Sequence, residues 1–325
     1  METSARKILV TGSTGQIGTE LTQELRRRYG AKNVVAGGHR REPDPSIRNG
    51  PFEVFDVTDS TELRAVITKH GIDTVYHLAA VLSAVGEKDP VLAWKINLDG
   101  FRNLLEVARS ERVSRIFWPS SIAVFGPDVS RVNTPQEAKL TPTTIYGVAK
   151  VAGELLANYY YLKYGIDIRS VRYPGLISSV TPPGGGTTDY AVEIFYEALK
   201  SRSYKCFLRE DTILPMMYMP DALRAAIQLM EAPAANVMCR TSYNLAAVSF
   251  SAGDLAREIS KRVKGFRVEY KPDYRQAIAD SWPMSVDDSR ARHDWGWRHE
   301  YDIQSIARDM LEKLTLKLNV QIDKD

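Results

Sequence analysis

A tyrosine and a lysine stand four residues apart in the run Tyr146-Gly147-Val148-Ala149-Lys150, which opens a helical pattern. A spacing of four places the phenol and the ammonium on one face of a helix. A free phenol has a pKa of about 10 and is a poor base at neutral pH, but a fixed positive charge nearby favours the phenolate. The pattern therefore predicts that Tyr146 moves a proton and that Lys150 lowers the pKa of its phenol. Taken alone, an ordinary helix surface is the alternative.

Two serines lie where a hydroxyl would reach the same reacting group. Ser120 and Ser121 follow a predicted strand at residues 115–118. In open α/β sheets, ligands bind at the carboxyl ends of the strands. We therefore expect a serine here to contact the same substrate oxygen as Tyr146. A polar strand terminus without a ligand is the alternative.

Three glycines mark a phosphate-binding turn near the start of the chain. Gly12, Gly15 and Gly18 lie between a predicted strand at residues 7–11 and a helical pattern. The first permits a tight turn, the second lets the backbone approach a pyrophosphate, and the third allows the helix to pack closely on the strand. This context predicts a dinucleotide site, and a strand-to-helix turn without a ligand is the alternative.

The residues after the second and third predicted strands bear on which dinucleotide binds. Asp56 follows the third strand, where its carboxylate would accept a hydrogen bond from the adenine amino group, although it could equally be a turn residue. The second strand ends in Gly37-Gly38-His39-Arg40-Arg41, without the acidic residue that binds the ribose 2′-hydroxyl of NAD. Arg40 or Arg41 would suit the 2′-phosphate of NADP instead. NAD is the expected cofactor, and NADP stays open.

The elements that hold these residues alternate between short β-branched runs and longer helical patterns. That order is typical of βαβ units around a parallel sheet buried on both faces. Asp59 and Glu62 have the spacing of a helix cap for the pattern that reaches residue 70. We predict an α/β fold with a Rossmann-type doubly wound parallel sheet. Its strands are expected at residues 7–11, 33–37, 52–55, 74–77, 115–118 and 168–172.

The pattern changes after Pro174, where a loop rich in proline and glycine precedes shorter mixed elements. We predict a smaller α+β C-terminal lobe that binds the substrate. Residues 1–177 would form the dinucleotide-binding domain, and residues 217–246 would return to it. Residues 178–216 and 247–325 would form the substrate-binding lobe, which ends in a helix near residues 302–314.

Composition disfavours several other classes of protein. The 325 residues include 43 basic and 40 acidic side chains, a net charge of +3, and the basic ones are scattered, so nucleic acid is not an expected partner. Cys206 and Cys239 lie outside any metal-ligand spacing, so no metal site is expected. The most apolar stretch, residues 76–85, is much shorter than the roughly 20 residues of a membrane span. The first strand begins too early for a signal peptide or presequence.

Together these motifs resemble those of the extended short-chain dehydrogenases, which include the nucleotide-sugar epimerases. In that family the residue matching Ser121 positions the reacting oxygen, the one matching Tyr146 carries the proton, and the one matching Lys150 holds the nicotinamide ribose; Ser120 is a second candidate for the first role. The resemblance covers nearly the whole chain. It implies a cofactor site formed by Gly12, Thr14, Gly15, Gln16, Ile17, Gly18, His39, Arg40, Asp56, Val57, Leu78, Ala79, Ala80, Asn97, Tyr146, Lys150, Tyr173 and Leu176.

Within that family, the runs at residues 176–178, 183–193, 214–221 and 281–283 are similar to those of the short-chain L-threonine 3-dehydrogenases. The resemblance implies L-threonine as substrate, bound by Ser83, Ser121, Tyr146, Thr187 and Asp189. Hydroxyls of Ser83 and Thr187 would bind the carboxylate and Asp189 the ammonium, unless Ser83 only satisfies loop backbone and Asp189 only caps the following helix. The glycines at residues 184–186 suggest a lid or a plain surface turn.

Two other functions compete with this interpretation. A nucleotide-sugar epimerase or dehydratase uses the same tyrosine and lysine but holds a much larger ligand. A non-catalytic NAD(P)-sensing regulator would not need the proton-carrying residues. The resemblance also implies a homodimer formed by the helical patterns at residues 90–110 and 143–165. We expect a bacterial cytoplasmic location, or the mitochondrial matrix if the source is eukaryotic.

Overall fold

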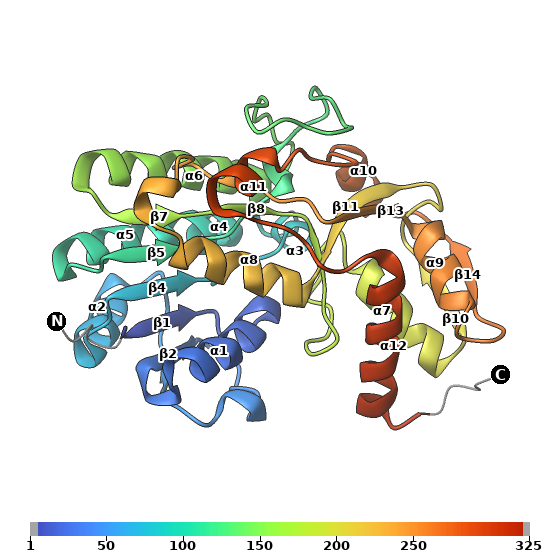
Figure 1. The fold of residues 1–325 in the computed structure, drawn as a ribbon, viewed down its shortest axis with the longest axis horizontal. Helices are drawn as coiled ribbons and strands as arrows, with labels where there is room; N and C mark the ends of the chain where they lie inside the picture. The colour runs from blue at the N-terminus through green and yellow to red at the C-terminus, as the bar shows by residue number, and fades with distance from the viewer. Residues whose placement is uncertain (1–5, 321–325) are drawn as a thin grey trace.

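The computed structural model describes residues 6–320, and its centre is a parallel sheet of six strands. The sheet order is β3-β2-β1-β4-β5-β7, with every neighbouring pair parallel (Figure 1). This order and the helices on both faces confirm the predicted Rossmann-type α/β fold. The strands are β1 (Ile8–Thr11), β2 (Val34–Gly38), β3 (Phe52–Val54), β4 (Thr74–His77), β5 (Arg115–Phe117) and β7 (Asp167–Arg169).

Alternate residues of the central strand face two different hydrophobic clusters, because successive side chains of a strand point to opposite faces. Ile8 and Val10 pack with α1 (Gln16–Tyr29) and α8 (Met219–Glu231) on one face. Leu9 packs on the other face with α2 (Ser60–His70), α5 (Gly100–Glu111) and α6 (Ile145–Tyr164). Burying both faces explains why these strands are continuously apolar.

One predicted strand ends early and another is divided in the structure. The run at 115–118 ends as β5, and the chain continues after Pro119 into a separate short strand, β6 (Ser120–Ser121). The run at 168–172 divides into β7 and β8 (Val171–Tyr173). Because proline cannot donate to a ladder, the strand pairing shifts here, and β6 and β8 join β12 (Tyr243–Asn244) in a separate three-stranded sheet.

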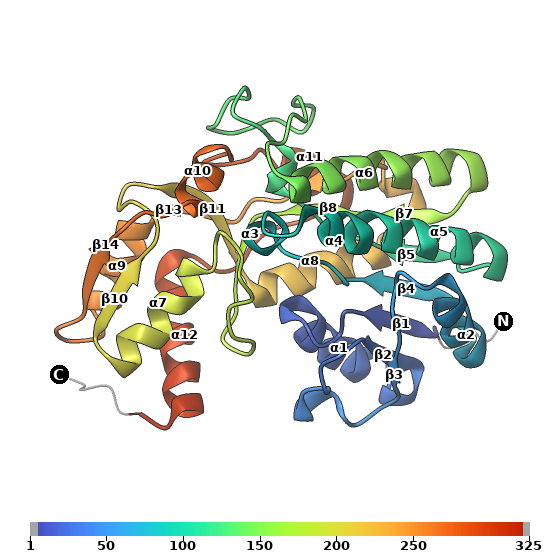
Figure 2. The same cartoon turned by 180° about the vertical axis from the view of Figure 1, so that it is seen from behind.

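The C-terminal elements lie together to one side of the six-stranded sheet (Figure 2). They pack around a separate hydrophobic cluster. A three-stranded sheet in the order β13-β11-β9 and a two-stranded sheet of β10 and β14 contribute to it. The expected C-terminal helix is present as α12 (Ile303–Leu318), capped by Asp302. The other elements are β9 (Gly175–Ile177), α7 (Tyr190–Lys200), β10 (Ser203–Cys206), β11 (Ile213–Tyr218), β13 (Val248–Ser251), α9 (Ala252–Ser260), β14 (Arg267–Tyr270), α10 (Arg275–Asp280) and α11 (Ser289–Trp295).

The chain passes between the two parts more than once. α8 packs beneath β1, and β12 pairs with β8. Ala291 and Trp297 pack into the same cluster as α8, a second return that the sequence pattern did not indicate. The division of the chain into two domains stays a prediction.

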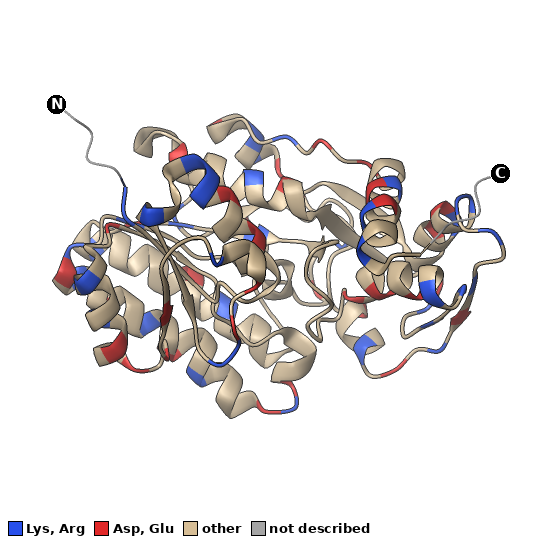
Figure 3. Ribbon diagram, turned by 90° about the horizontal axis from the view of Figure 1, so that it is seen from below, with Lys and Arg blue, Asp and Glu red and all other residues tan. Residues whose placement is uncertain are grey.

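Lys and Arg residues are interspersed with Asp and Glu along the helices of both parts (Figure 3). Among residues 6–320, no helix is both long enough and apolar enough to cross a bilayer. Within the same range, His, Cys, Asp and Glu form no cluster of three or more that could hold a metal ion.

Candidate active site

The glycine turn between β1 and α1 brings backbone segments into very close approach. Gly12 has φ +67°, and a Cβ there would lie 2.7 Å from the amide nitrogen of Ala79. A Cβ at Gly18 would lie 2.1 Å from the Gly12 carbonyl oxygen. At Gly15 the only neighbour within 4 Å of such a Cβ, among the described residues, is the Gly12 carbonyl oxygen at 3.2 Å. The turn therefore tolerates no side chain at Gly12 or Gly18 and leaves open space at Gly15.

The start of α1 fits a diphosphate. Gly15 is the N-cap residue of α1, no side chain caps this end, and its first turn contains no acidic residue. The amide nitrogen of the Gln16 side chain is buried without a hydrogen-bond partner in the described part of the chain. Unsatisfied donors at a helix N-terminus favour a bound anion. Thr14 lies in this turn and Ile17 in the first turn of α1; their contact with a cofactor stays a prediction.

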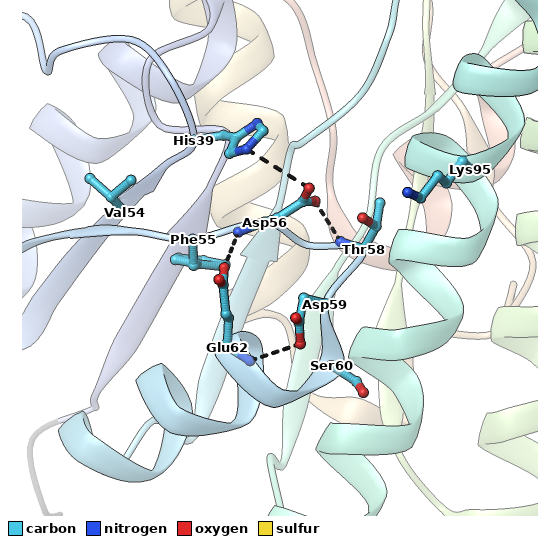
Figure 4. Close-up of a pocket in the computed structure, with 9 residues that line it drawn as sticks. All are labelled: His39, Val54, Phe55, Asp56, Thr58, Asp59, Ser60, Glu62 and Lys95. Carbon is cyan, nitrogen blue, oxygen red and sulfur yellow. Dashed lines mark hydrogen bonds and ion pairs between the residues drawn. The ribbon is translucent and has the colours of Figure 1, made fainter.

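The expected adenosine end of the cofactor site lies at the ends of β2 and β3 (Figure 4). Asp56 accepts a hydrogen bond from the Thr58 amide at 2.8 Å, and the His39 ring lies 3.8 Å from its carboxylate. Burial would raise the pKa of Asp56, but the Thr58 hydrogen bonds and the charges of His39 and Lys95 hold it below its usual value. Asp56, His39 and Lys95 line an open pocket of about 730 Å³.

The predicted cap at the start of α2 is half correct. Asp59 accepts hydrogen bonds from the amides of Thr61 and Glu62 at 2.8 and 3.2 Å. The Glu62 carboxylate does not return to the Asp59 amide; it accepts from the amide of Asp56 at 2.7 Å. Glu62 therefore fixes the backbone of Asp56 and Val57, and Val57 itself is buried under Gly100.

The segment after β4 is held beside the glycine turn by two polar side chains. The Thr11 hydroxyl lies 2.8 Å from His77 Nδ1 and accepts from the amide of Leu78 at 3.2 Å. Burial, and then the charge of Lys150, lower the pKa of His77 to about 3, so the ring is neutral. These contacts position Leu78, Ala79 and Ala80 next to Gly12.

Asn97 hydrogen-bonds to the backbone of Val81, at the other end of the segment that follows β4. Its side chain accepts from the amide of Val81 at 2.7 Å and donates to the carbonyl of the same residue at 3.0 Å. Asn97 lies in a π-helical turn (Lys95–Asp99) between α4 (Pro90–Trp94) and α5. Such turns are frequent at functional sites.

Tyr146 and Ser121 are brought together by the close packing of α6 on the end of β6. Thr144 caps α6, and a Cβ at Gly147 would lie 2.2 Å from the Ala123 carbonyl oxygen. Tyr146 and Ser121 share a side-chain hydrogen bond. Burial raises the pKa of Tyr146 to about 12, and the Ser121 hydrogen bond opposes that rise.

The surroundings of Lys150 differ from the prediction that its charge lowers the pKa of Tyr146. Its ammonium donates to the Pro119 carbonyl at 2.6 Å and lies over the rings of Trp118 and Tyr146, at 4.5 and 5.4 Å from their centroids. Burial lowers the pKa of Lys150 to about 7, and Glu154 opposes this. In the protein alone, burial therefore outweighs any effect of the lysine on the Tyr146 phenol, and the pKa is raised where the sequence predicted a decrease.

Ser120 does not join Tyr146. Side chains of successive strand residues point to opposite faces, and the Ser120 hydroxyl donates to the buried Glu154 carboxylate at 2.6 Å. Glu154 also accepts from Arg172, at 2.9 and 2.8 Å. We did not predict this buried ion pair from the sequence. Its signal was an acidic residue one helical turn after Lys150 on the same helix face.

Ser83 and Thr187 meet although they lie far apart in the sequence. Both are buried, and their hydroxyl oxygens are 3.1 Å apart. Ser83 begins the short helix α3 (Ser83–Gly86), which packs against α6. Glu87, just after α3, accepts from the amide of Ile145 at 2.8 Å and ties α3 to the start of α6.

Asp189 holds the glycine loop before α7. Its carboxylate accepts hydrogen bonds from the amides of Gly185 and Gly186 at 2.7 and 2.8 Å. Asp189 is the N-cap residue of α7, but its side chain makes no capping hydrogen bond, so simple helix capping does not explain it. Burial raises the pKa of Asp189, and the glycine amides oppose that rise. A Cβ at Gly185 would lie 2.7 Å from Val85, so this loop is seated against α3.

Two residues expected at the cofactor lie in the hydrophobic interior near it. Tyr173 donates its phenol to the Ala222 carbonyl at 2.6 Å, away from the glycine turn. Leu176 lies in β9 and packs against the cluster that contains α8. Neither side chain makes a polar contact with the residues of the phosphate turn that the structure describes. The contact of these two residues with a cofactor stays a prediction.

Comparison with known proteins identifies the family. A model described as the NAD dependent epimerase/dehydratase family matches residues 8–246. A relative from Staphylococcus haemolyticus, described as an uncharacterized epimerase/dehydratase, is 48% identical over 313 residues, 96% of this chain and 98% of the relative. The mitochondrial L-threonine 3-dehydrogenase of Bos taurus is 47% identical over 311 residues, 95% of this chain and 83% of the bovine protein.

The chain is also similar to a solved structure over nearly its whole length. The L-threonine dehydrogenase of Clostridium difficile is 49% identical and has a TM-score of 0.93, covering 96% of this chain and 98% of that one. The matches and the fit of the glycine turn to a diphosphate identify an NAD-dependent oxidoreductase that acts on an alcohol. By the extent of these matches, the chain belongs to the NAD dependent epimerase/dehydratase family.

Proposed function

We propose that this protein is an L-threonine 3-dehydrogenase, which oxidises the 3-hydroxyl of L-threonine to give 2-amino-3-oxobutanoate. The observation that carries the proposal is the likeness to solved L-threonine dehydrogenases over almost the full length of both chains. The buried hydroxyl pair of Ser83 and Thr187 supports it, because a small amino acid needs only a few close polar contacts.

The reaction assigns a separate role to each side chain near the end of β6. Ser121 donates a hydrogen bond to the substrate oxygen, and Tyr146 takes the proton of the 3-hydroxyl as the hydride leaves the same carbon. NAD⁺ bound at the glycine turn would supply the hydride acceptor and a positive charge near the phenol. Lys150 holds the strand end through the Pro119 carbonyl and, on this proposal, binds the nicotinamide ribose.

The carboxylate and ammonium groups of the substrate would be bound by α3 and by the loop before α7. The hydroxyls of Ser83 and Thr187 would donate to the carboxylate. Asp189 would attract the ammonium group, and a cation next to it would favour the ionised carboxylate that burial disfavours. The glycine loop at residues 184–186 would open for entry and close against α3 to exclude water.

A direct assay separates this proposal from the runner-up, a nucleotide-sugar epimerase or dehydratase. The purified protein is incubated with NAD⁺ and L-threonine, and the absorbance of the reduced nicotinamide is followed. We expect steady reduction with L-threonine and no conversion of UDP-glucose or UDP-galactose. Tyr146→Phe should abolish turnover and leave NADH binding unchanged. Conversion of a nucleotide sugar without threonine oxidation would contradict the proposal.

We also propose that the protein forms a homodimer through α4 and α6. These neighbouring helices expose several large apolar side chains, among them Val91 at 80%, Leu162 at 73% and Leu155 at 60%. Exposed apolar side chains grouped on neighbouring helices are typical of an interaction site. Sedimentation at micromolar concentration should give the dimer mass, and Leu155→Glu with Leu162→Glu should give the monomer. A wild-type monomer would contradict this proposal.

A further inference from the structure

The end of β2 lacks the side chain that selects NAD. In dinucleotide folds an acidic residue about 20 positions after the glycine turn binds the ribose 2′-hydroxyl, and here that position is Gly38. A Cβ at Gly38 would lie 3.3 Å from the methyl carbon of Thr14, so Gly38 borders the phosphate turn. The same Cβ would lie 2.8 Å from the ring of Phe52. The site therefore has neither an acidic residue at this position nor room for one.

Two arginines that follow Gly38 have no partner among the described residues. Arg40 and Arg41 are exposed, and neither makes a hydrogen bond or ion pair with any residue in the described range 6–320. His39, at the same turn, faces Asp56 at 3.8 Å. An arginine at this point of the fold is the usual partner of a 2′-phosphate, because guanidinium–phosphate hydrogen bonds are charge-assisted.

The acidic side chains near this site already accept hydrogen bonds from backbone amides. Asp56 accepts a hydrogen bond from the Thr58 amide, Asp59 from the Glu62 amide in the first turn of α2, and Glu62 from the Asp56 amide (Figure 4). Lys95 lines the same pocket and adds a positive charge beside Asp56. The carboxylates therefore stabilise the loop, whereas the guanidinium donors of Arg40 and Arg41 stay available to a ligand.

We propose that the adenosine end of the cofactor site accepts a ribose 2′-phosphate, so that the protein binds NADP(H) as well as NAD(H), with Arg40 as the principal phosphate partner. The absence of an acidic side chain at Gly38 removes the repulsion that would exclude the phosphate. This inference concerns the cofactor alone and does not depend on the substrate proposed above.

Equilibrium titration of the protein with NADPH and with NADH, followed by nicotinamide fluorescence, tests the proposal without turnover. We expect the two dissociation constants to agree within about tenfold, and 2′,5′-ADP to compete more strongly than 5′-ADP. Arg40→Ala should weaken NADPH binding by about tenfold and NADH binding by less than about twofold. Arg109→Ala, an exposed arginine paired with Glu106 on α5, removes the same charge elsewhere and should change neither.

The reverse change restores an acidic side chain. Gly38→Asp in a Phe52→Leu background, which relieves the ring contact, should weaken NADPH binding by tenfold or more while NADH binding persists. Persistent NADH binding shows that this variant is folded. The proposal is overturned if wild-type protein binds NADH but not NADPH at a hundredfold higher concentration. It is equally overturned if Arg40→Ala weakens both dinucleotides to the same degree.

Discussion

Replacing Arg172 by methionine should destabilise the protein strongly, because the change leaves the Glu154 carboxylate buried without its partner. The Glu154 side chain is 0% exposed and that of Arg172 is 4% exposed, with Nη2 2.8 Å from the carboxylate. Removing one partner of a buried ion pair costs about 3–5 kcal/mol. This loss is a large part of the roughly 5–15 kcal/mol that stabilises a typical protein. At an unfolding entropy of about 2.1 cal/mol/K per residue, a chain of 325 residues loses about 1.5 °C per kcal/mol, so Tm should fall by roughly 4–8 °C.

Urea unfolding at neutral pH measures this loss, and an exposed pair supplies the control. Arg257 pairs with Asp254, and their side chains are 62% and 44% exposed, so Arg257→Met should cost less than about 1 kcal/mol. Because Glu154 also holds Ser120, beside Ser121, Arg172→Met should lower kcat by tenfold or more at a temperature where it stays folded. Equal unfolding free energies for the two methionine variants would refute the reasoning.

Three further predictions follow from the site. Ser121→Ala removes the hydrogen bond that lowers the Tyr146 pKa, so that pKa rises and the increase of kcat/KM with pH should move to higher pH; an unchanged profile, or a shift to lower pH, would contradict it. Gly18→Ala places a Cβ 2.1 Å from a carbonyl oxygen and should weaken NADH binding by tenfold or more in a fluorescence titration, whereas unchanged affinity would argue against the phosphate turn. Ser83→Ala should raise KM for L-threonine more than it lowers kcat, and a change in kcat alone would exclude a carboxylate contact.

The central sheet was predictable because its six strands are short runs that contain apolar or β-branched residues and alternate with helical patterns in the βαβ order. The early end of the strand at 115–118 and the division of the one at 168–172 were not, since they depend on the pairing of β6 with β8 and of β8 with β12, which lies far along the chain. The return of Trp297 to the cluster beneath β1 is also a tertiary contact without a local signal.

The residue types of the candidate site were predictable from the sequence. The directions in which the side chains point were less so. The glycine turn and the Tyr146–Lys150 spacing are local patterns that the fold preserves. Ser120 and Ser121 were both candidates from the sequence; strand alternation turns them to opposite sides, and the packing of α6 decides that Ser121 meets Tyr146. The raised pKa of Tyr146 reflects burial by several elements at once, a quantity that residue spacing does not contain.

Transfer of deuterium from L-threonine labelled at C3 tests the account most directly. The protein is incubated with NAD⁺ and the labelled amino acid. The reduced dinucleotide is then isolated, and its mass is measured by mass spectrometry. We predict one deuterium in each reduced nicotinamide ring, and no reduced dinucleotide from the Tyr146→Phe variant. Reduced dinucleotide without the label, or full activity in that variant, would contradict oxidation of the threonine alcohol at this site.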